Sequence, residues 1–231
     1  GIGCKVNIVQ VRKNLGIGSR TPCWEMAWKF DAEISTTQLN GITWQVGRTG
    51  ALTPVAELEP IGIGGVIVSR ATLHGAERFE ELKPLIGCQV KVRRAGDVIP
   101  EIVEIIKVSD DFENIPTYCP CCYSDVERVG ANIFCMSAKN GTNCRDRDVQ
   151  SISYAVSRDV LNFENVGEGV IEKLYDNHVI HRLTNIFDLE TDLLEEFRTV
   201  YPGRAGDKIL KGINEGRSSV DFWRFISFGR A

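Results

Sequence analysis

Five of the chain's eight cysteines lie within the 26 positions CPCCYSDVERVGANIFCMSAKNGTNC, residues 119–144. Cys119 and Cys122 form a C-x2-C pair, a spacing that lets two thiolates point at one metal ion. Cys135 and Cys144 follow 13 and 22 residues after Cys122, near enough to complete a tetrahedron. Cys121 offers a different register for the first pair. We predict a structural Zn²⁺ bound by Cys119, Cys122, Cys135 and Cys144, with no coordination position left for water.

Two other uses of clustered cysteines fit the sequence less well. A thioredoxin-like redox pair usually lies in a βαβ pattern, which is not visible around this segment. Disulfides belong to oxidising compartments, and the chain's start lacks the basic and then apolar pattern of a secretory signal. The longest apolar runs are short, such as GGVIV at 64–68. We therefore expect a cytoplasmic protein with no membrane span.

Two glycine-bearing turns, NVGEGVIEKL at 165–174 and PGRAGDKIL at 202–210, each precede a segment with helical periodicity. Backbone N–H groups at such a helix start can hold a phosphate, as helix-hairpin-helix motifs do with DNA. A glycine between helices is also an ordinary C-cap. The formal net charge of −4 does not favour nucleic acid, but binding requires only a local basic surface. The predicted DNA contacts are Gly167, Gly169, Gly203 and Arg204.

The elements around these motifs change character along the chain. Residues 40–108 contain short β-branched segments separated by Gly and Pro, such as the alternating QVKVRR at 89–94. Five such segments suit a small barrel, either an OB-fold or an SH3-like barrel. Residues 114–146 have little apolar content and need a metal to hold them together. From 147 onward, apolar residues recur at helical spacing. We predict a multidomain α+β chain with a β-barrel, a four-cysteine zinc finger and a helical domain.

Several long motifs resemble those of the bacterial NAD-dependent DNA ligases. They are WQVGRTGALTPVAELEPI at 44–61, VSRATLH at 68–74 and VRRAGDVIPEI at 92–102, followed by the four cysteines and SRDVLNFENVGEGVIEKL at 157–174. GIGCKVN at 1–7 and LGIGSRTPCWEMAWKF at 15–30 resemble the end of that family's nucleotidyltransferase domain. The resemblance implies four parts: the end of the nucleotidyltransferase domain (1–38), an OB-fold (39–110), a zinc finger (111–147) and an incomplete helix-hairpin-helix domain (148–231).

The resemblance also implies an activity. These ligases seal single-strand nicks in duplex DNA through lysyl-adenylate and DNA-adenylate intermediates, using NAD and Mg²⁺. The lysine motif K-x-D-G, which carries the adenylate, is absent from this sequence. We therefore expect the isolated chain not to adenylylate itself, and we expect a monomer of bacterial or viral origin whose partner is nicked double-stranded DNA. The alternative is a stand-alone, non-catalytic DNA-binding module derived from a ligase.

Residue roles follow from the resemblance position by position. Lysines in two of its motifs face the adenylate phosphate, and arginines of the OB-fold engage DNA beside the nick. Some positions depart from the family pattern: Cys23 replaces an arginine, Trp28 a tyrosine, and CRDR at 144–147 replaces CPAQ. The residues to which the resemblance gives a role are Lys5 and Lys29 for the adenylate, and Arg48, Thr49, Arg93 and Arg94 for DNA.

Overall fold

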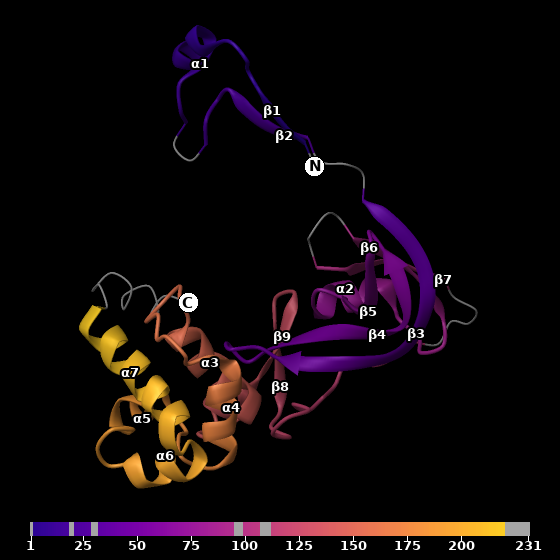
Figure 1. The fold of residues 1–231 in the computed structure, drawn as a ribbon. Helices are drawn as coiled ribbons and strands as arrows, with labels where there is room; N and C mark the ends of the chain where they lie inside the picture. The colour runs from indigo at the N-terminus through magenta and orange to yellow at the C-terminus, as the bar shows by residue number, and fades with distance from the viewer. Residues whose placement is uncertain (1, 19–20, 29–31, 95–98, 107–111, 220–231) are drawn as a thin grey trace. The chain divides into compact units, whose positions relative to one another are not determined.

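The computed structural model describes residues 2–18, 21–28, 32–94, 99–106 and 112–219 (Figure 1). Backbone contacts divide the chain into two units. The first consists of Gly1–Thr43 and Pro54–Asn114, and the second of Trp44–Thr53 and Ile115–Ala231. In the described part of the chain, no helix has both the length and the apolar character needed to cross a membrane.

Five strands form a small closed barrel. Their order is β3–β6–β7–β5–β4, and a further pairing of β3 with β4 closes the ring. The pair β5 and β7 is parallel, and a helix lies between the third and fourth strands of the barrel. This topology is that of an OB-fold, so the OB prediction is confirmed and the SH3-like alternative is rejected. The bounds are β3 Glu33–Val46, β4 Ala51–Ile63, β5 Val66–Thr72, α2 Ala76–Leu82, β6 Gln89–Arg94 and β7 Glu101–Ile106.

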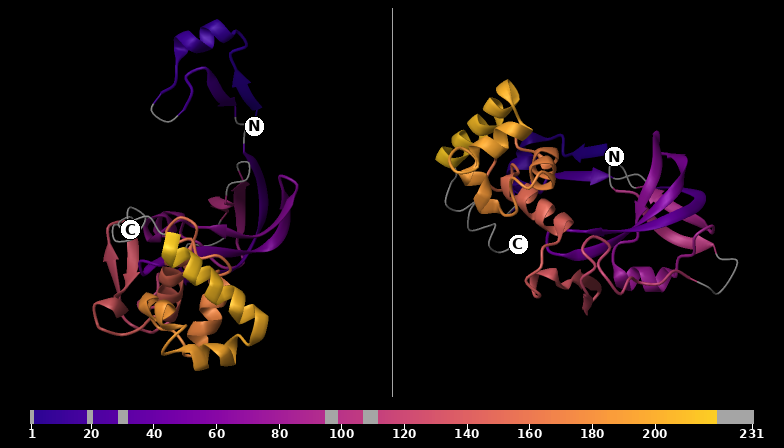
Figure 2. Two further views of the ribbon diagram at one scale, coloured as in Figure 1. Left: turned by 60° about the vertical axis from the view of Figure 1, so that its left-hand side comes forward. Right: turned by 90° about the horizontal axis from the view of Figure 1, so that it is seen from below.

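The alternation of side chains along these strands fills the barrel. In β4, every second residue from Leu52 to Leu58 is buried, as expected of a strand with one face toward a core. Val90, Val92 and Ile102 are buried from β6 and β7. Figure 2 shows β3 and β4 as long, curved strands. The β4–β5 register shifts between Glu57 and Ile61, beside Pro60, which has no N–H to donate.

The N-terminal residues form a small separate piece. Strands β1 (Ile2–Lys5) and β2 (Glu25–Trp28) pair antiparallel, with helix α1 (Val9–Leu15) between them in the sequence. None of the described residues from 2 to 28 is buried. A two-stranded sheet is marginal by itself, so this piece has no core of its own.

The cysteine segment folds as a hairpin of β8 (Val126–Val129) and β9 (Asn132–Cys135), followed by the 3-10 turn η1 (Met136–Ala138). Strand β9 also pairs with the start of β4, where Ala51 faces Phe134 and Leu52 faces Ile133. The hairpin's edge is thereby paired with a second strand.

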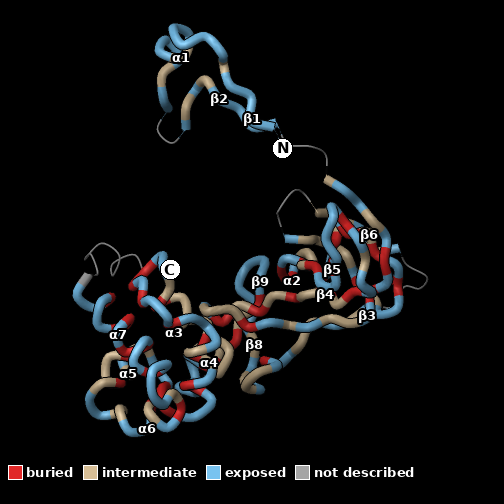
Figure 3. Tube along the Cα trace, viewed as in Figure 1, coloured by how far each residue is buried: buried red, intermediate tan, exposed pale blue. Residues whose placement is uncertain are grey.

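Five helices follow and share one apolar core. Buried residues along them (red in Figure 3) include Ile152, Ile171, Phe197 and Ile213. Phe163 and Phe187 meet edge to face, with ring centroids 6.0 Å apart. The bounds are α3 Arg145–Val156, α4 Glu168–Asp176, α5 Leu183–Asp188, α6 Leu194–Val200 and α7 Gly203–Ser219.

Two glycines let α7 approach the segment before α4 at backbone distance. A Cβ at Gly212 would lie 1.8 Å from the carbonyl oxygen of Glu164, and a Cβ at Gly216 would lie 2.2 Å from the Phe163 ring. Each contact is below any allowed van der Waals separation. Gly216 therefore has a packing role in this chain.

We expect Gly212→Ala to lower the free energy of unfolding by about 2 kcal/mol, because the new methyl group forces α7 away from Glu164. Urea denaturation followed by circular dichroism measures this loss. The matched control is Gly169→Ala in α4, where a Cβ would meet nothing within 4 Å and stability should stay equal or rise slightly. Equal stabilities of the two variants would contradict the close approach of α7.

Candidate metal centre and nucleic-acid interface

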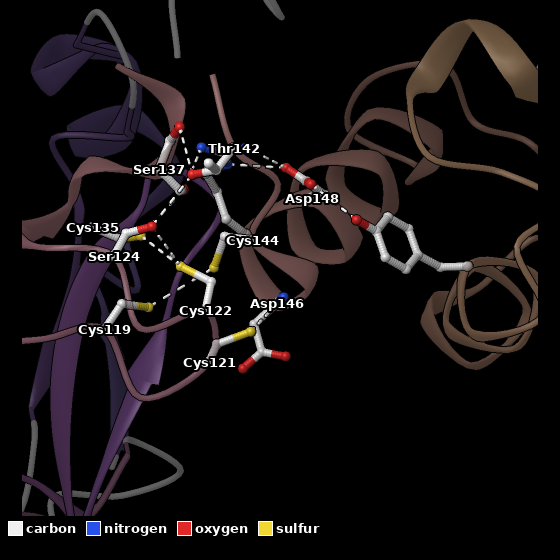
Figure 4. Close-up of polar contacts among 12 residues, drawn as sticks. Cys119, Cys121, Cys122, Ser124, Cys135, Ser137, Thr142, Cys144, Asp146 and Asp148 are labelled. Atoms are coloured by element: carbon white, nitrogen blue, oxygen red, sulfur yellow. Dashed lines mark hydrogen bonds and ion pairs between the residues drawn. The ribbon is translucent and has the colours of Figure 1, made fainter. Parts of the chain in front are cut away.

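Four sulfurs converge at one point in the second unit. The Sγ atoms of Cys119, Cys122, Cys135 and Cys144 all lie within 4.8 Å of one another (Figure 4). Cys119 and Cys144 are 3.9 Å apart, and Cys122 and Cys135 are 3.4 Å apart. A tetrahedral zinc site with Zn–S bonds of about 2.3 Å requires sulfur separations of about 3.8 Å. The cluster is therefore compatible with a four-sulfur zinc site, and it joins the four cysteines that the spacing predicts.

Local backbone geometry brings the sulfurs together. Tyr123 adopts a left-handed φ of 57° and donates its N–H to the Cys119 carbonyl at 2.9 Å, which closes the first knuckle. Cys135 ends strand β9, and Cys144 is the N-cap residue of α3. A thiolate at a helix N-terminus is stabilised by the helix dipole. A turn, a strand end and a helix start therefore each supply ligands.

The fifth cysteine stands outside the cluster. The backbone N–H of Asp146 donates to Cys121 Sγ at 3.4 Å, and burial raises the pKa of the Cys121 thiol. Figure 4 shows its sulfur beside Asp146. The structure thus favours the Cys119–Cys122 register that was left open by the sequence.

The acid–base properties of the cluster suit a bound cation. Burial raises the pKa of the Cys119 thiol to about 11 and raises that of Cys144 further. Burial also acts to raise the pKa of Cys122, but hydrogen bonds with Ser124 and Cys135 bring it down to about 7. Thiolates that share a largely buried space repel one another unless a positive charge lies between them. A divalent metal supplies that charge and takes thiolates as ligands.

A chain of polar contacts leads from this cluster to helix α4. The Cys135 thiol and the Arg147 guanidinium both donate to Ser137 Oγ, at 3.2 and 2.8 Å. Arg147 also pairs with Asp148 at 2.7 Å, and the Tyr175 hydroxyl donates to the other Asp148 oxygen at 3.0 Å. Burial, and then the bond to Asp148, raise the pKa of Tyr175 to about 12. The Arg147–Asp148 pair is mostly buried, so its loss would be costly.

The sequence analysis noted Arg147 within the departure CRDR and assigned it no role at the metal centre. The alternation of arginine and aspartate directly after the last cysteine was the available signal, but it could not reveal the partner on α4. Arg145 makes a second link from α3 to α4, because its guanidinium binds both carboxylate oxygens of Asp176 at 2.6 and 2.7 Å. This pair holds the pKa of the Asp176 carboxyl below its usual value.

The turn that carries Arg48 and Thr49 lies in the same unit. Gly47 donates to Ala51 and Gly50 donates to Gly47, at 2.8 and 2.9 Å, which makes a tight turn between β3 and β4. Gly50 has a φ of 85°, a conformation that favours glycine. Thr49 is exposed, and the Arg48 guanidinium lies 4.1 Å from the centre of the Tyr154 ring.

The two predicted glycine turns lie at helix starts. Gly167 is the N-cap residue of α4, and Gly169 is in its first turn. Gly203 has a φ of 60° where α7 begins, and Arg204 follows it with an exposed side chain. The first N–H groups of each helix have no intrahelical acceptor. Gln150 donates to Glu168, which places a carboxylate beside the first of these helix starts.

The arginines of β6 are already engaged. Arg93 pairs with Glu101 at 2.5 Å, and the His74 ring lies 2.7 Å from the same carboxylate. Although burial acts to raise it, these hydrogen bonds leave the pKa of Glu101 lowered. Arg94 donates to the Gly64 carbonyl at 3.2 Å. DNA would have to compete with these contacts, and the roles of both arginines stay predictions.

The structure describes one of the two lysines that are predicted to face the adenylate. Lys5 is on β1, opposite Glu25 on β2, and its ammonium lies 3.1 Å from the Glu25 carboxylate. Lys29 lies outside the described residues. The structure therefore neither brings the two lysines together nor separates them.

The sequence model of the NAD-dependent DNA ligase OB-fold domain matches residues 36–113. The match covers the barrel described above and the segment that leads to the cysteines. The ligase resemblance predicted from the motifs of the barrel is confirmed.

Similarity to DNA ligases extends beyond the ligase OB-fold. The chain is 40% identical to a DNA ligase of Alkaliphilus oremlandii (strain OhILAs) over 232 residues, which cover 99% of this chain and 34% of that ligase. It is 39% identical to a DNA ligase of Alkaliphilus metalliredigens (strain QYMF) over 217 residues, 92% of this chain and 32% of that ligase. The chain thus spans about a third of the length of these relatives.

The sulfur geometry predicts which cysteines hold the metal. Cys119→Ser should lose most of the bound Zn²⁺ and unfold the 114–146 segment, because one of four thiolates is removed. Cys121→Ser should keep one Zn²⁺ per chain. Metal analysis after dialysis against a weak chelator, combined with limited proteolysis, compares the two. Loss of metal from Cys121→Ser with retention in Cys119→Ser would show that the other register is used.

Proposed function

We propose that this chain is the portion of an NAD-dependent DNA ligase that binds the duplex around a single-strand nick. The complete enzyme would seal the nick through lysyl-adenylate and DNA-adenylate intermediates, using NAD and Mg²⁺. The observation that carries the proposal is the 40% identity to a DNA ligase over 99% of the chain, together with the ligase OB-fold at 36–113.

The proposed contacts are to the DNA backbone. Arg48 and Arg204 present guanidinium groups that suit two phosphate oxygens at once. The starts of α4 and α7 offer backbone N–H groups and the positive ends of helix dipoles. Such contacts fix the position of a protein on DNA without reading its sequence, which suits an enzyme that must act at any nick.

The cysteine cluster would hold Zn²⁺ in a structural role. Its four sulfurs complete a tetrahedral shell, so the ion would have no free position for water or substrate. Through Ser137, Arg147 and Asp148 the cluster connects to Tyr175 on α4. A metal there would fix the start of the helical part rather than take part in bond making.

A second candidate is a DNA-binding module without ligase activity. The Lys5–Glu25 ion pair favours it, because this pair neutralises a lysine that the resemblance places opposite the adenylate phosphate. Both candidates share the same DNA contacts, but only the ligase portion has a use for Lys5.

We expect the chain to bind a nicked duplex with a steep salt dependence, because phosphate contacts release counterions. About four contacts correspond to a loss of affinity of about 100-fold between about 50 and about 200 mM salt. Fluorescence anisotropy with a labelled nicked duplex measures this slope, and Arg204→Ala should reduce the slope by about one.

The matched control is Arg78→Ala. The Arg78 guanidinium is already held by Glu81 and by the Val103 carbonyl, so its removal should leave the slope unchanged. A flat salt dependence of the unaltered chain would count against backbone binding under either candidate function.

We also expect no transfer of labelled AMP from NAD to the isolated chain, because its sequence lacks the nucleophilic lysine motif. Denaturing electrophoresis after incubation with Mg²⁺ and labelled NAD detects a covalent adduct, and a ligase that has K-x-D-G serves as the positive control. A labelled band that disappears in Lys5→Ala would contradict this expectation.

A further inference from the structure

The turn at residues 47–50 is anchored on the hairpin of β8 and β9. The N–H of Cys135 donates to the Gly50 carbonyl at 2.8 Å. A Cβ at Gly50 would lie 3.4 Å from the Cys135 carbonyl oxygen and 3.8 Å from Arg147 Cδ. Gly50 is buried. The backbone of the turn therefore has a fixed position in the second unit, set by a predicted zinc ligand.

The side chain of Arg48 has a separate support. Its guanidinium carbon lies 4.1 Å from the centre of the Tyr154 ring, on helix α3. Tyr154 is half-buried and packs against the apolar core of the five helices. The ring is thus held by the helical core, and the arginine rests on it.

The Arg48 guanidinium carries a positive charge that the Tyr154 ring does not neutralise. Within the described ranges of the chain, no carboxylate forms an ion pair with it, in contrast to Arg93, Arg145 and Arg147. A cation over an aromatic face is attracted to the ring's quadrupole. This attraction uses the face of the guanidinium and leaves its N–H edge available to a second partner.

We propose that Tyr154 is a positioning residue that holds the Arg48 guanidinium for a DNA phosphate beside the nick. The proposal rests on the DNA contact assigned to Arg48 under the proposed function. Arg48 has four rotatable bonds, and ordering them on binding would weaken the contact. Stacking on Tyr154 orders the side chain before DNA arrives, while the turn fixes its backbone.

The experiment compares Tyr154→Leu with Tyr154→Phe in the full chain. Leucine keeps an apolar side chain for the helical core but removes the ring, and phenylalanine keeps the ring. Anisotropy with a labelled nicked duplex should show binding about three- to tenfold weaker for Tyr154→Leu. Binding by Tyr154→Phe should stay within about twofold of the unaltered chain. Circular dichroism and zinc content should be the same for both variants.

A double-mutant cycle separates positioning from a general structural effect. In an Arg48→Ala background, Tyr154→Leu should change binding by less than about twofold, because no guanidinium remains to be held. In the free protein, the Arg48 side-chain protons should resonate upfield because of the ring, in Tyr154→Phe as in the unaltered chain but not in Tyr154→Leu.

Several results would overturn the proposal. The first is an equal loss of DNA binding when Tyr154→Leu is introduced into the unaltered chain and into Arg48→Ala. The others are unchanged or tighter DNA binding by Tyr154→Leu alone. If Arg48→Ala binds the nicked duplex as well as the unaltered chain, the role of Tyr154 is refuted while the proposed function stands. If the unaltered chain does not bind duplex DNA, both are refuted.

Discussion

The convergence of four sulfurs is the constraint on which the second unit depends. Cys119, Cys122, Cys135 and Cys144 come from a turn, a strand end and a helix start, and the segment between them contributes little apolar surface. A hairpin of this size buries too little apolar surface to fold alone, and the proposed Zn²⁺ would supply the missing free energy. The same hairpin then pairs with the start of β4 and begins helix α3. One small site thus sets the local geometry of the turn at 47–50 and of the helical part.

The packing of the helical part depends instead on two glycines, which have no side chain to keep the neighbouring segment away. Without a side chain at Gly212 and Gly216, α7 lies directly on the Glu164 carbonyl and the Phe163 ring. This contact places the start of α7 and the turn before α4 in one packed body, which also contains Arg204. The two turns proposed to bind phosphates would act together only if they are held rigidly, and the close contacts of the two glycines provide such a link without any charge.

The sequence was sufficient to predict features with a short-range signature. The barrel follows from alternating segments such as QVKVRR, and the cluster of four sulfurs follows from the cysteine spacing. Features that depend on contacts between residues distant in the sequence could not be predicted from it. The Arg147–Asp148–Tyr175 chain joins residues on two helices, and Lys5 meets Glu25 only because β1 and β2 pair. The C-x2-C spacing already favoured Cys122 over Cys121, and the sulfur cluster of the structure contains Cys122 and not Cys121. The domain boundaries at 38, 110 and 147 stay predictions.

The pairing of β9 with β4 has a consequence for the order of folding. The sulfur site closes a loop of 26 residues, whereas the pairing of Ala51 with Phe134 closes one about three times longer. Loop-closure entropy makes the longer closure less favourable by about 1 kcal/mol. The four-cysteine segment at 119–144 is therefore expected to form early as a local nucleus. The turn at 47–50, which carries Arg48, is expected to pack against it afterwards. A chain deprived of metal during refolding would then be delayed at the step that joins residues 44–53 to the rest of their unit.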